Sequence, residues 1–424
     1  MTLMRISCVK KLISAALVVF VQAGVSGGLS IGEAARSAEP SLRPLQFSLD
    51  FVGMHTLSPA RHWPDIQFGS IRPAGTSWGA MEPAKGQFDW HSLDTWVAQS
   101  QSHHVQLDYV FVNVPRWAST RPDESCIGRK FGCAAPPNID DFTAFVTALV
   151  TRYRGKISSY ELWNEPNASG FWTGTPKQMV ELAAQVYPII KSIDPAAIVT
   201  TPAVSSTGWP LSHDVWLDQY LAAGGGKYAD VIAWHGYAGR NDRPSLAPEG
   251  LSDQIRALRR TLEKHHLAHM PIWNTEGGWG KDAQLPDENE QAGFLTKWYL
   301  INFTNGISRA YWYQWDNSEW GTLWRDGSGI TPAGKAARQV ITWLEGTTAA
   351  APCHVMPRSQ VWECDLRKGN KLYRVVWSAS GESAFSNVAG VASITPLGGS
   401  QRAVDHQPIT VTSKPLLLEY AETK

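Results

Sequence analysis

The sequence predicts an α/β protein, a (β/α)8 TIM barrel followed by a small C-terminal β-sandwich. From about Gln46 onward, short apolar runs alternate with longer amphipathic stretches, which is the pattern of repeated βα units. Polar residues cluster where the apolar runs end, and alternating strand-like segments with Gly, Ser and Pro between them follow residue 344. We therefore predict three parts: a leader (1–38), a barrel (39–344) and a sandwich (345–424).

The first 38 residues are expected to be a signal peptide and a disordered leader. Arg5, Lys10 and Lys11 precede an apolar run from Leu12 to Val25, and small residues follow that run. This order is typical of a secretory signal. The run is shorter than the ~18–20 residues that a membrane span requires. We expect a secreted or periplasmic protein with no membrane attachment after signal cleavage.

Eight apolar runs are the predicted barrel strands. Each is nearly continuous in apolar character, as expected of parallel strands that are covered on both faces. A doubly wound open sheet is the alternative, but no G-x-G-x-x-G motif follows the first run. The strands are predicted at 47–53, 68–73, 106–113, 157–163, 198–202, 231–235, 271–276 and 308–315, and helices at 139–153, 176–193, 253–266, 290–305 and 331–344.

The C-terminal region carries four predicted sandwich strands, at 360–366, 371–377, 409–412 and 416–420. Four cysteines follow the leader, in two close pairs: Cys126 with Cys133, and Cys353 with Cys364. Close spacing favours two local disulfides formed in an oxidising compartment. Four cysteines allow three connectivities, however. A metal site is the weaker alternative, because neither pair has C-x2-C spacing.

Composition argues against charged partners. Lys+Arg and Asp+Glu both total 38, so the formal net charge is zero, and nothing favours nucleic acid or an anionic membrane. The chain has 20 tryptophans. Packing between barrel helices accounts for many of them, but flat apolar rings also suit the C–H faces of sugars. We expect an oligosaccharide or polysaccharide as the partner.

Two glutamates lie in matching contexts at predicted strand ends. Glu165 lies in YELWNEPN (160–167) and Glu276 in IWNTEGGW (272–279). There is room for about three βα units between them, which would place them across the barrel mouth, where active sites of this fold are built. A retaining glycosidase needs two carboxyl groups about 5–5.5 Å apart. The pair therefore predicts this chemistry.

The segment Trp163-Asn164-Glu165-Pro166 resembles the Asn-Glu signature of clan A, the retaining (β/α)8-barrel glycoside hydrolases. The likeness is greatest to family 39, with family 5 as the near relative, and covers roughly residues 46–344. It also rests on the segments WGAMEP (78–83), GQFDW (86–90), PRWAS (115–119) and HGY (235–237). The resemblance implies that Glu165 is the acid/base, that Glu276 is the nucleophile, and that Asn164 binds the sugar 2-hydroxyl at the −1 subsite.

The same resemblance implies further substrate-site residues. Arg72 would lie beside the nucleophile, Tyr237 would touch Glu276, and Trp312 would form the floor of the −1 subsite. His235 is assigned to the site because it stands beside Tyr237. The alternative is an ion pair for Arg72 and barrel packing for Trp312. Weaker subsite candidates are His55, Asn113, Trp117 and Trp273.

We expect a retaining glycoside hydrolase that cleaves β-type glycosidic bonds by double displacement, with Glu165 protonated and Glu276 ionised. The many tryptophans near strand ends favour several subsites and so endo action on a polysaccharide. The alternatives are an exo-acting β-xylosidase-like enzyme, a transglycosylase, and a non-catalytic carbohydrate-binding protein on the same barrel.

We expect a monomer without cofactor or metal. His265, His266 and His269 are not accompanied by a carboxylate or Cys that would complete a metal site. Residues 329–335 match most of a phosphate-binding G-x-x-x-x-G-K loop, but Ala336 stands where a magnesium-binding hydroxyl belongs. This segment is better explained as the cap of the last barrel helix.

Overall fold

The computed structural model describes residues 45–58, 62–207, 212–238, 247–404 and 407–421. The predicted leader lies outside these residues. No helix within the described ranges is long and apolar enough to cross a membrane.

Nine parallel strands form the central sheet, in the order β7-β6-β3-β2-β1-β11-β10-β9-β8. Thr201 N donates to Val231 O (2.9 Å), and Thr200 bridges Val231, which joins β7 to the start of β9 and closes the ring. Since β8 follows β7 after three residues and also pairs with β9, the two are parts of one stave. This is the predicted (β/α)8 barrel. Its strands are β1 (Val52–Thr56), β2 (Ser70–Pro73), β3 (Gln106–Val110), β6 (Ser159–Glu161), β7 (Ile198–Thr200), β8 (Val204–Ser205), β9 (Ile232–His235), β10 (Ile272–Gly277) and β11 (Arg309–Trp312).

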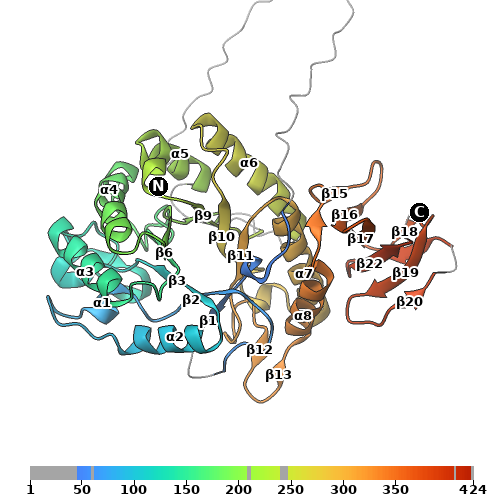
Figure 1. The fold of residues 1–424 in the computed structure, drawn as a ribbon, viewed down its shortest axis with the longest axis horizontal. Coiled ribbons are helices and arrows are strands. Elements are labelled where there is room, and N and C mark those ends of the chain that lie inside the picture. The colour runs from blue at the N-terminus through green and yellow to red at the C-terminus, as the bar shows by residue number, and fades with distance from the viewer. Residues whose placement is uncertain (1–44, 59–61, 208–211, 239–246, 405–406, 422–424) are drawn as a thin grey trace, which may run out of the picture. The chain divides into compact units, whose positions relative to one another are not determined.

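Helices surround the ring of strands (Figure 1). α7 is the most enclosed, with every residue from Gln291 to Thr304 buried. Thr331 caps α8 by accepting a hydrogen bond from Gly334 N (3.2 Å), so the segment 329–335 is a helix start, as predicted. The helices are α1 (Trp78–Met81), α2 (His91–Ser102), α3 (Ile139–Arg152), α4 (Pro176–Ile193), α5 (His213–Ala222), α6 (Leu251–Lys264), α7 (Glu288–Thr304) and α8 (Pro332–Leu344).

The first predicted strand is placed too early in the chain. Residues Leu49–Phe51 form a 3-10 turn, and β1 starts at Val52. The reason is aromatic packing, because Phe47 and Phe51 both make edge-to-face contacts with Phe303 of α7. This apolar run therefore covers one end of the barrel core before the strand begins.

The C-terminal region is built from antiparallel sheets, as predicted. A seven-stranded sheet and a two-stranded sheet share a separate apolar core that includes Val376, Phe385, Ile394, Val411 and Leu418. The larger sheet contains β14 (Thr348–Ala349), β15 (His354–Val355), β16 (Val361–Lys368), β17 (Lys371–Ser378), β19 (Val391–Pro396), β20 (Arg402–Ala403) and β22 (Leu416–Tyr420), and the smaller one contains β18 (Ser383–Phe385) and β21 (Ile409–Val411). The domain limits 39–344 and 345–424 stay a prediction.

The cysteines pair locally. Disulfides join Cys126 to Cys133 and Cys353 to Cys364. The first closes a short hairpin of β4 (Ser125–Cys126) and β5 (Lys130–Phe131) in the loop after β3, and the second ties the segment before β15 to β16. Of the three connectivities that the sequence allowed, the local one is observed.

Because the barrel interior is closely packed, we predict that one added methyl group at Gly53 destabilises the fold. Gly53 of β1 faces Tyr311 of β11, and a Cβ at Gly53 would lie 2.3 Å from the ring. Gly53→Ala should lower the free energy of unfolding by about 1–3 kcal/mol, because overpacking moves the ring or the strand. Gly79→Ala is the matched control, since its Cβ would meet nothing closer than 3.5 Å. Urea unfolding that shows equal losses for the two variants would contradict this prediction.

Candidate active site

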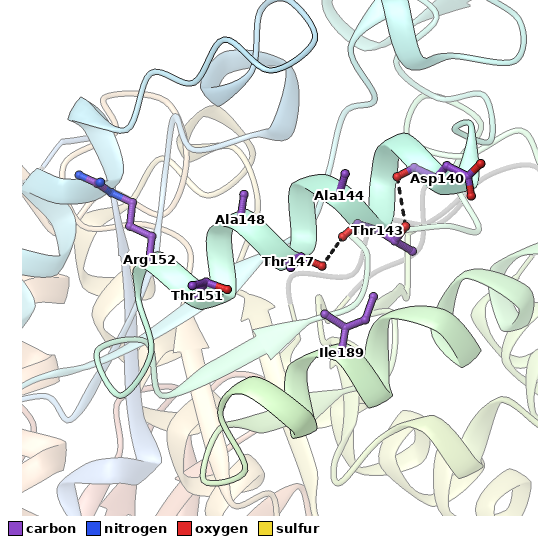
Figure 2. Close-up of a pocket in the computed structure, with 8 residues that line it drawn as sticks. All are labelled: Asp140, Thr143, Ala144, Thr147, Ala148, Thr151, Arg152 and Ile189. Carbon is purple, nitrogen blue, oxygen red and sulfur yellow. Dashed lines mark hydrogen bonds between the residues drawn. The ribbon is translucent and has the colours of Figure 1, made fainter.

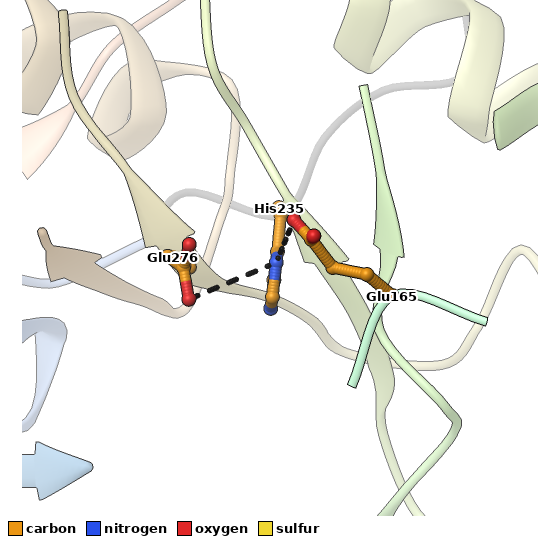
Figure 3. Close-up of side chains that lie close together, drawn as sticks. All are labelled: Glu165, His235 and Glu276. Atoms are coloured by element: carbon orange, nitrogen blue, oxygen red, sulfur yellow. Dashed lines mark hydrogen bonds and ion pairs between the residues drawn. The ribbon is translucent and has the colours of Figure 1, made fainter. Parts of the chain in front are cut away.

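The two glutamates meet at the barrel mouth (Figure 3). One ligand atom from each of Glu165, His235 and Glu276 lies within 4.8 Å of the other two, so the two carboxylates approach to within that distance. Glu276 lies in β10, and Glu165 follows β6. The two side chains are 14% and 15% exposed, enough for a ligand to reach them.

Glu165 has an unusual backbone. Its φ is +42°, in the left-handed region that non-glycine residues rarely adopt and that costs about 1–2 kcal/mol. Two backbone hydrogen bonds of 2.9 Å hold this conformation, from Glu165 N to Ala203 O and from Ala168 N to Glu165 O. The turn thereby aims the carboxylate back toward β9 and β10.

His235 stands between the two glutamates. It ends β9 and is fully buried. Its Nδ1 lies 2.9 Å from Glu165 Oε1, within hydrogen-bond distance, and 3.9 Å from Glu276 Oε2. The imidazole therefore contacts one carboxylate directly and acts on the charge of both.

Arg72 and Tyr237 hold Glu276 from its other sides. Arg72 Nη1 donates to Glu276 Oε2 (3.0 Å), and the Tyr237 hydroxyl donates to Glu276 Oε1 (2.7 Å). Arg72 Nη2 donates to Asn164 Oδ1 (2.7 Å) and to Glu161 Oε1 (2.6 Å). The structure thus brings Arg72, Asn164, His235 and Tyr237 together with the glutamates, and it adds Glu161, which the sequence analysis did not single out.

The surroundings shift the pKa values of Glu165 and His235 in opposite directions. Burial by itself lowers the pKa of His235, but the charge of Glu276 and the hydrogen bond and charge of Glu165 raise it above its ordinary 6.5. Burial raises the pKa of Glu165, yet the hydrogen bond and charge of His235 bring it below 4.5. We expected a protonated Glu165, whereas these shifts favour the proton on the imidazole of His235.

Glu276 and its neighbours shift differently. Burial raises the pKa of Glu276 above 4.5, and the charge of Glu165 adds to this, although His235, Arg72 and Tyr237 oppose it. Burial and the charge of Glu276 raise the pKa of Tyr237 well above 10, so its hydroxyl keeps the proton that it donates. Glu276 is therefore a more basic carboxylate than its two hydrogen bonds alone would suggest.

Trp312 does not lie where the resemblance placed it. Its side chain is fully buried, its Nε1 donates to Gly321 O (2.7 Å), and its ring packs against Trp279 and Trp298. The next residue, Tyr313, is half-buried, and burial, together with the charges of Glu276 and Glu165, raises the pKa of its hydroxyl. Tyr313 is thus an aromatic ring beside the carboxylates.

The weaker candidates divide between the two ends of the barrel. His55 lies at the site, donates Nε2–H to Thr275 O (2.9 Å), and contacts Tyr313 at 5.1 Å between ring centroids. Burial and the charge of Arg72 hold the pKa of His55 well below 6.5, which keeps the ring neutral. Trp273 instead stacks with Arg309, where β11 begins. It is therefore not a subsite residue.

Asn113 and Trp117 belong to the loop after β3. Asn113 is half-buried with φ +59°, and its Oδ1 is a buried acceptor without a partner among the described residues. Trp117 is half-buried, and its Nε1 donates to Glu82 O (3.0 Å). Both lie on this rim of the barrel, and their role as subsite residues stays a prediction.

Glu165, His235 and Glu276 are also ligands that a cation accepts. However, Arg72 Nη1 already lies 3.0 Å from Glu276 Oε2, and the pKa of His235 is raised, so positive charge is present on two sides. A divalent ion would add to this charge in a buried setting, where like charges are costly. We assign no metal to the site.

A hollow on the outer face of the barrel carries no comparable chemistry (Figure 2). It runs along α3 past Ile189 of α4, and Thr and Ala side chains line most of it. Asp140 and Arg152 stand at its two ends (Figure 2). None of its lining residues belongs to the carboxylate cluster.

The family model that matches the chain is "Cellulase (glycosyl hydrolase family 5)", over residues 88–318, which is more than half of the chain. The chain belongs to glycosyl hydrolase family 5. It accordingly belongs to the clan A glycoside hydrolases, and the matched segment includes both glutamates.

This family 5 member is also similar to other named glycoside hydrolases. A β-xylosidase of Geobacillus stearothermophilus is 25% identical over 157 residues, which are 32% of this chain and 30% of that protein. The chain thus matches less than a third of this relative. Among solved structures, a family 39 glycoside hydrolase from Bacteroides cellulosilyticus has a TM-score of 0.69 at 18% identity, with 88% of this chain and 81% of that chain covered. A family 30 endoxylanase from Clostridium papyrosolvens has a TM-score of 0.60 at 15% identity, with 90% and 98% covered. These structures share the fold.

The buried ion pairs of Arg72 predict a large loss of stability when they are broken. Arg72→Met should lower the free energy of unfolding by about 3–5 kcal/mol at neutral pH, because Glu161 and Glu276 lose their counter-charge. Arg338→Met is the control, since Arg338 pairs with Asp65 at the surface and such pairs contribute about 0–1 kcal/mol. Equal losses in urea unfolding would contradict a buried charge cluster.

Proposed function

We propose that this family 5 protein is a retaining glycosidase that cleaves β-glycosidic bonds, with Glu276 as nucleophile and Glu165 as acid/base. The observation that carries the proposal is the approach of the two carboxylates to within 4.8 Å. A retaining mechanism uses about 5–5.5 Å, whereas an inverting one leaves about 6.5–9.5 Å for a water molecule.

The first step forms a glycosyl-enzyme. A Glu276 oxygen attacks the anomeric carbon, the bond from that carbon to the leaving oxygen breaks, and Glu165 gives its proton to that oxygen. In the second step, water attacks the same carbon, Glu165 takes a proton from the water, and the bond to Glu276 breaks. Two inversions at one carbon give overall retention.

The proton for the first step comes from the contact between His235 and Glu165. Their 2.9 Å hydrogen bond allows the proton to pass from Nδ1 to Oε1 without a relay. A substrate oxygen against Glu165 excludes water from the carboxylate and favours its neutral form. Once Glu276 is esterified, its charge is lost, so the pKa of Glu165 falls and its carboxylate is ionised and available to take the proton of water.

Aromatic rings support an endo-acting enzyme on a polysaccharide. Half-buried Trp117 follows β3 and half-buried Tyr313 follows β11, so the rim offers rings at two separate places. Tyr313 also contacts half-buried Trp320, at 6.4 Å between ring centroids. We assign the −1 floor to Tyr313 in place of Trp312, and the 2-hydroxyl contact to Asn164.

Xylan is the first substrate to test, because relatives include a β-xylosidase and an endoxylanase. An exo-acting β-xylosidase-like enzyme is the alternative. Both disulfides suit an oxidising compartment, which supports export. The monomer stays a prediction.

The test of the proposed function combines a substrate panel with stereochemistry. Incubation with xylan, β-glucans and mannan should release reducing ends, and proton NMR of the first product should show the β-anomer before mutarotation. Internal oligomers indicate endo action, and single sugars indicate exo action. A first product with the α-anomer would contradict retention, and no turnover on any β-linked glycan would favour a carbohydrate-binding protein.

Removal of either carboxylate should greatly slow or abolish turnover of natural substrates. Glu276→Gln removes the nucleophile, and Glu165→Gln should lower kcat by about 10²–10⁴-fold, the usual contribution of a general acid. On an aryl glycoside whose leaving phenolate needs no proton, glycosyl-enzyme formation by Glu165→Gln should be far less affected. Glu181→Gln on the exposed face of α4 is the control. Near wild-type rates in either site variant would contradict the assignment.

The pKa shifts predict a bell-shaped pH dependence of kcat/KM. Glu276 must be ionised and its pKa lies above 4.5, so activity should fall as the pH drops toward a midpoint above 4.5. The catalytic proton is lost as the pH rises through the raised pKa of His235, which places the second midpoint above 6.5. Initial rates on a soluble substrate from about pH 3 to pH 10 measure both limbs. A basic midpoint below 6.5 would contradict the role of His235.

A further inference from the structure

Glu161 is a third carboxylate beneath the reacting pair. It is the last residue of β6 and is fully buried. Its Oε1 lies 2.6 Å from Arg72 Nη2 and 3.9 Å from His235 Nε2. Among the described residues, Arg72 and His235 are the two cationic side chains that contact the reacting glutamates. One buried anion thus stands behind both.

Arg72 divides its charge between two carboxylates. Its contact with Glu161 is shorter than its contact with Glu276, at 2.6 Å against 3.0 Å. The Glu161 carboxylate is fully buried, so water does not stabilise its charge, whereas the Glu276 side chain is 14% exposed. Glu161 therefore takes a large share of the guanidinium charge. Glu276 keeps more of its negative charge for attack on carbon.

The second contact concerns His235. Its Nε2 is buried and has no hydrogen-bond partner among the described residues, and the carboxylate of Glu161 lies on that side of the ring. An anion at 3.9 Å favours the imidazolium over the neutral ring, because opposite charges attract strongly where water is excluded. Glu161 therefore helps His235 to hold the proton that Glu165 uses.

We propose that Glu161 is a positioning residue that sets the charge of both reacting carboxylates, through Arg72 for Glu276 and through His235 for Glu165. This inference rests on the proposed function. Glu161 touches neither the substrate nor a reacting atom. The alternative is a purely structural ion pair with Arg72.

Among the described residues, the charged groups near Glu161 come from three other strands: Arg72 of β2, Asp108 of β3 and His235 of β9. Glu276 of β10 shares Arg72 with Glu161, and Glu165 follows Glu161 in the chain. The neighbouring strand β7 presents Thr200, which does not titrate. Burial and the charge of Glu161 raise the pKa of Asp108 to about 7, so Asp108 relieves part of the negative charge by binding a proton.

Glu161→Gln tests the inference, since it removes the charge and keeps the shape. His235 loses a nearby anion, so the basic limb of the pH profile should move to lower pH by about one unit. Arg72 then turns more fully to Glu276, which lowers the pKa of Glu276 and moves the acid limb in the same direction. At the optimum, kcat should fall roughly ten- to hundredfold, the usual effect of a supporting residue.

Two further variants separate this role from a structural one. Glu161→Asp keeps the charge, so both limbs should stay in place even where kcat falls. Glu82→Gln removes another buried carboxylate, which accepts from Trp78 Nε1 (2.7 Å) and Gly86 N (2.8 Å) and contacts neither Arg72 nor His235. It should leave the limbs unmoved. If both limbs of the pH profile of Glu161→Gln coincide with those of wild type, the proposal is overturned and the Glu161–Arg72 contact is a structural ion pair.

A second readout does not depend on turnover. In protein with 15N-labelled histidine, NMR titration gives the pKa of His235 directly, with His235→Asn identifying its signal. The pKa should be lower in Glu161→Gln than in wild type, and unchanged in Glu82→Gln. Equal pKa values in wild type and Glu161→Gln would overturn the inference. If the wild type turned over no glycan but His235 shifted as expected, the proposed function would fail while the coupling to Glu161 stood.

Discussion

The site depends on the guanidinium of Arg72, which joins three staves of the barrel. It reaches Glu276 of β10 at 3.0 Å, Glu161 of β6 at 2.6 Å, and Asn164, just after β6, at 2.7 Å. A planar group with a fixed fork of donors holds several acceptors at set angles. Because Arg72 is only 5% exposed, water does not weaken these contacts. The position of Glu276 relative to Asn164 and Glu165 follows from this one side chain.

The arrangement is costly to stability and useful for chemistry. Buried charges lose hydration that their partners only partly restore, and the left-handed backbone of Glu165 adds strain. The surrounding core offsets these costs, above all α7, whose buried aromatic residues pack against β11. In return, two carboxylates and an imidazole lie together with one cation fixed beside them.

Much of the fold follows from the sequence, because a parallel strand covered on both faces must be apolar along its length. Seven of the eight runs contain barrel strands close to the predicted limits. The first run failed since Phe47 and Phe51 are apolar for a different reason, the contact with Phe303. Sequence pattern does not say whether an apolar residue lies in a strand or covers the end of a barrel.

Site residues could be predicted from the sequence where a chemically reactive side chain stands at the end of a predicted strand. Glu165 and Glu276 were singled out in this way, and the structure brings their carboxylates together. The sequence analysis placed Trp312 in the site, but its ring packs on the outside of the barrel against Trp298 of α7. Because successive side chains in an extended chain point to opposite faces, the next residue, Tyr313, points the other way. The sequence analysis passed over Glu161 and Asp108, because one acidic residue inside an apolar run does not change the apolar pattern that predicts a strand. A buried acid in a parallel strand is a usable signal, since it requires a partner.

The central claim is that Glu276 attacks the sugar while Glu165 handles the proton. The most direct measurement is covalent trapping with a 2-deoxy-2-fluoro glycoside that has a good leaving group, followed by peptide mass mapping of the slowly hydrolysed adduct. The xyloside and the glucoside are the probes. The account predicts one sugar per chain on the peptide that contains Glu276. A sugar on the peptide of Glu165, or inactivation of the enzyme without any adduct, would contradict it.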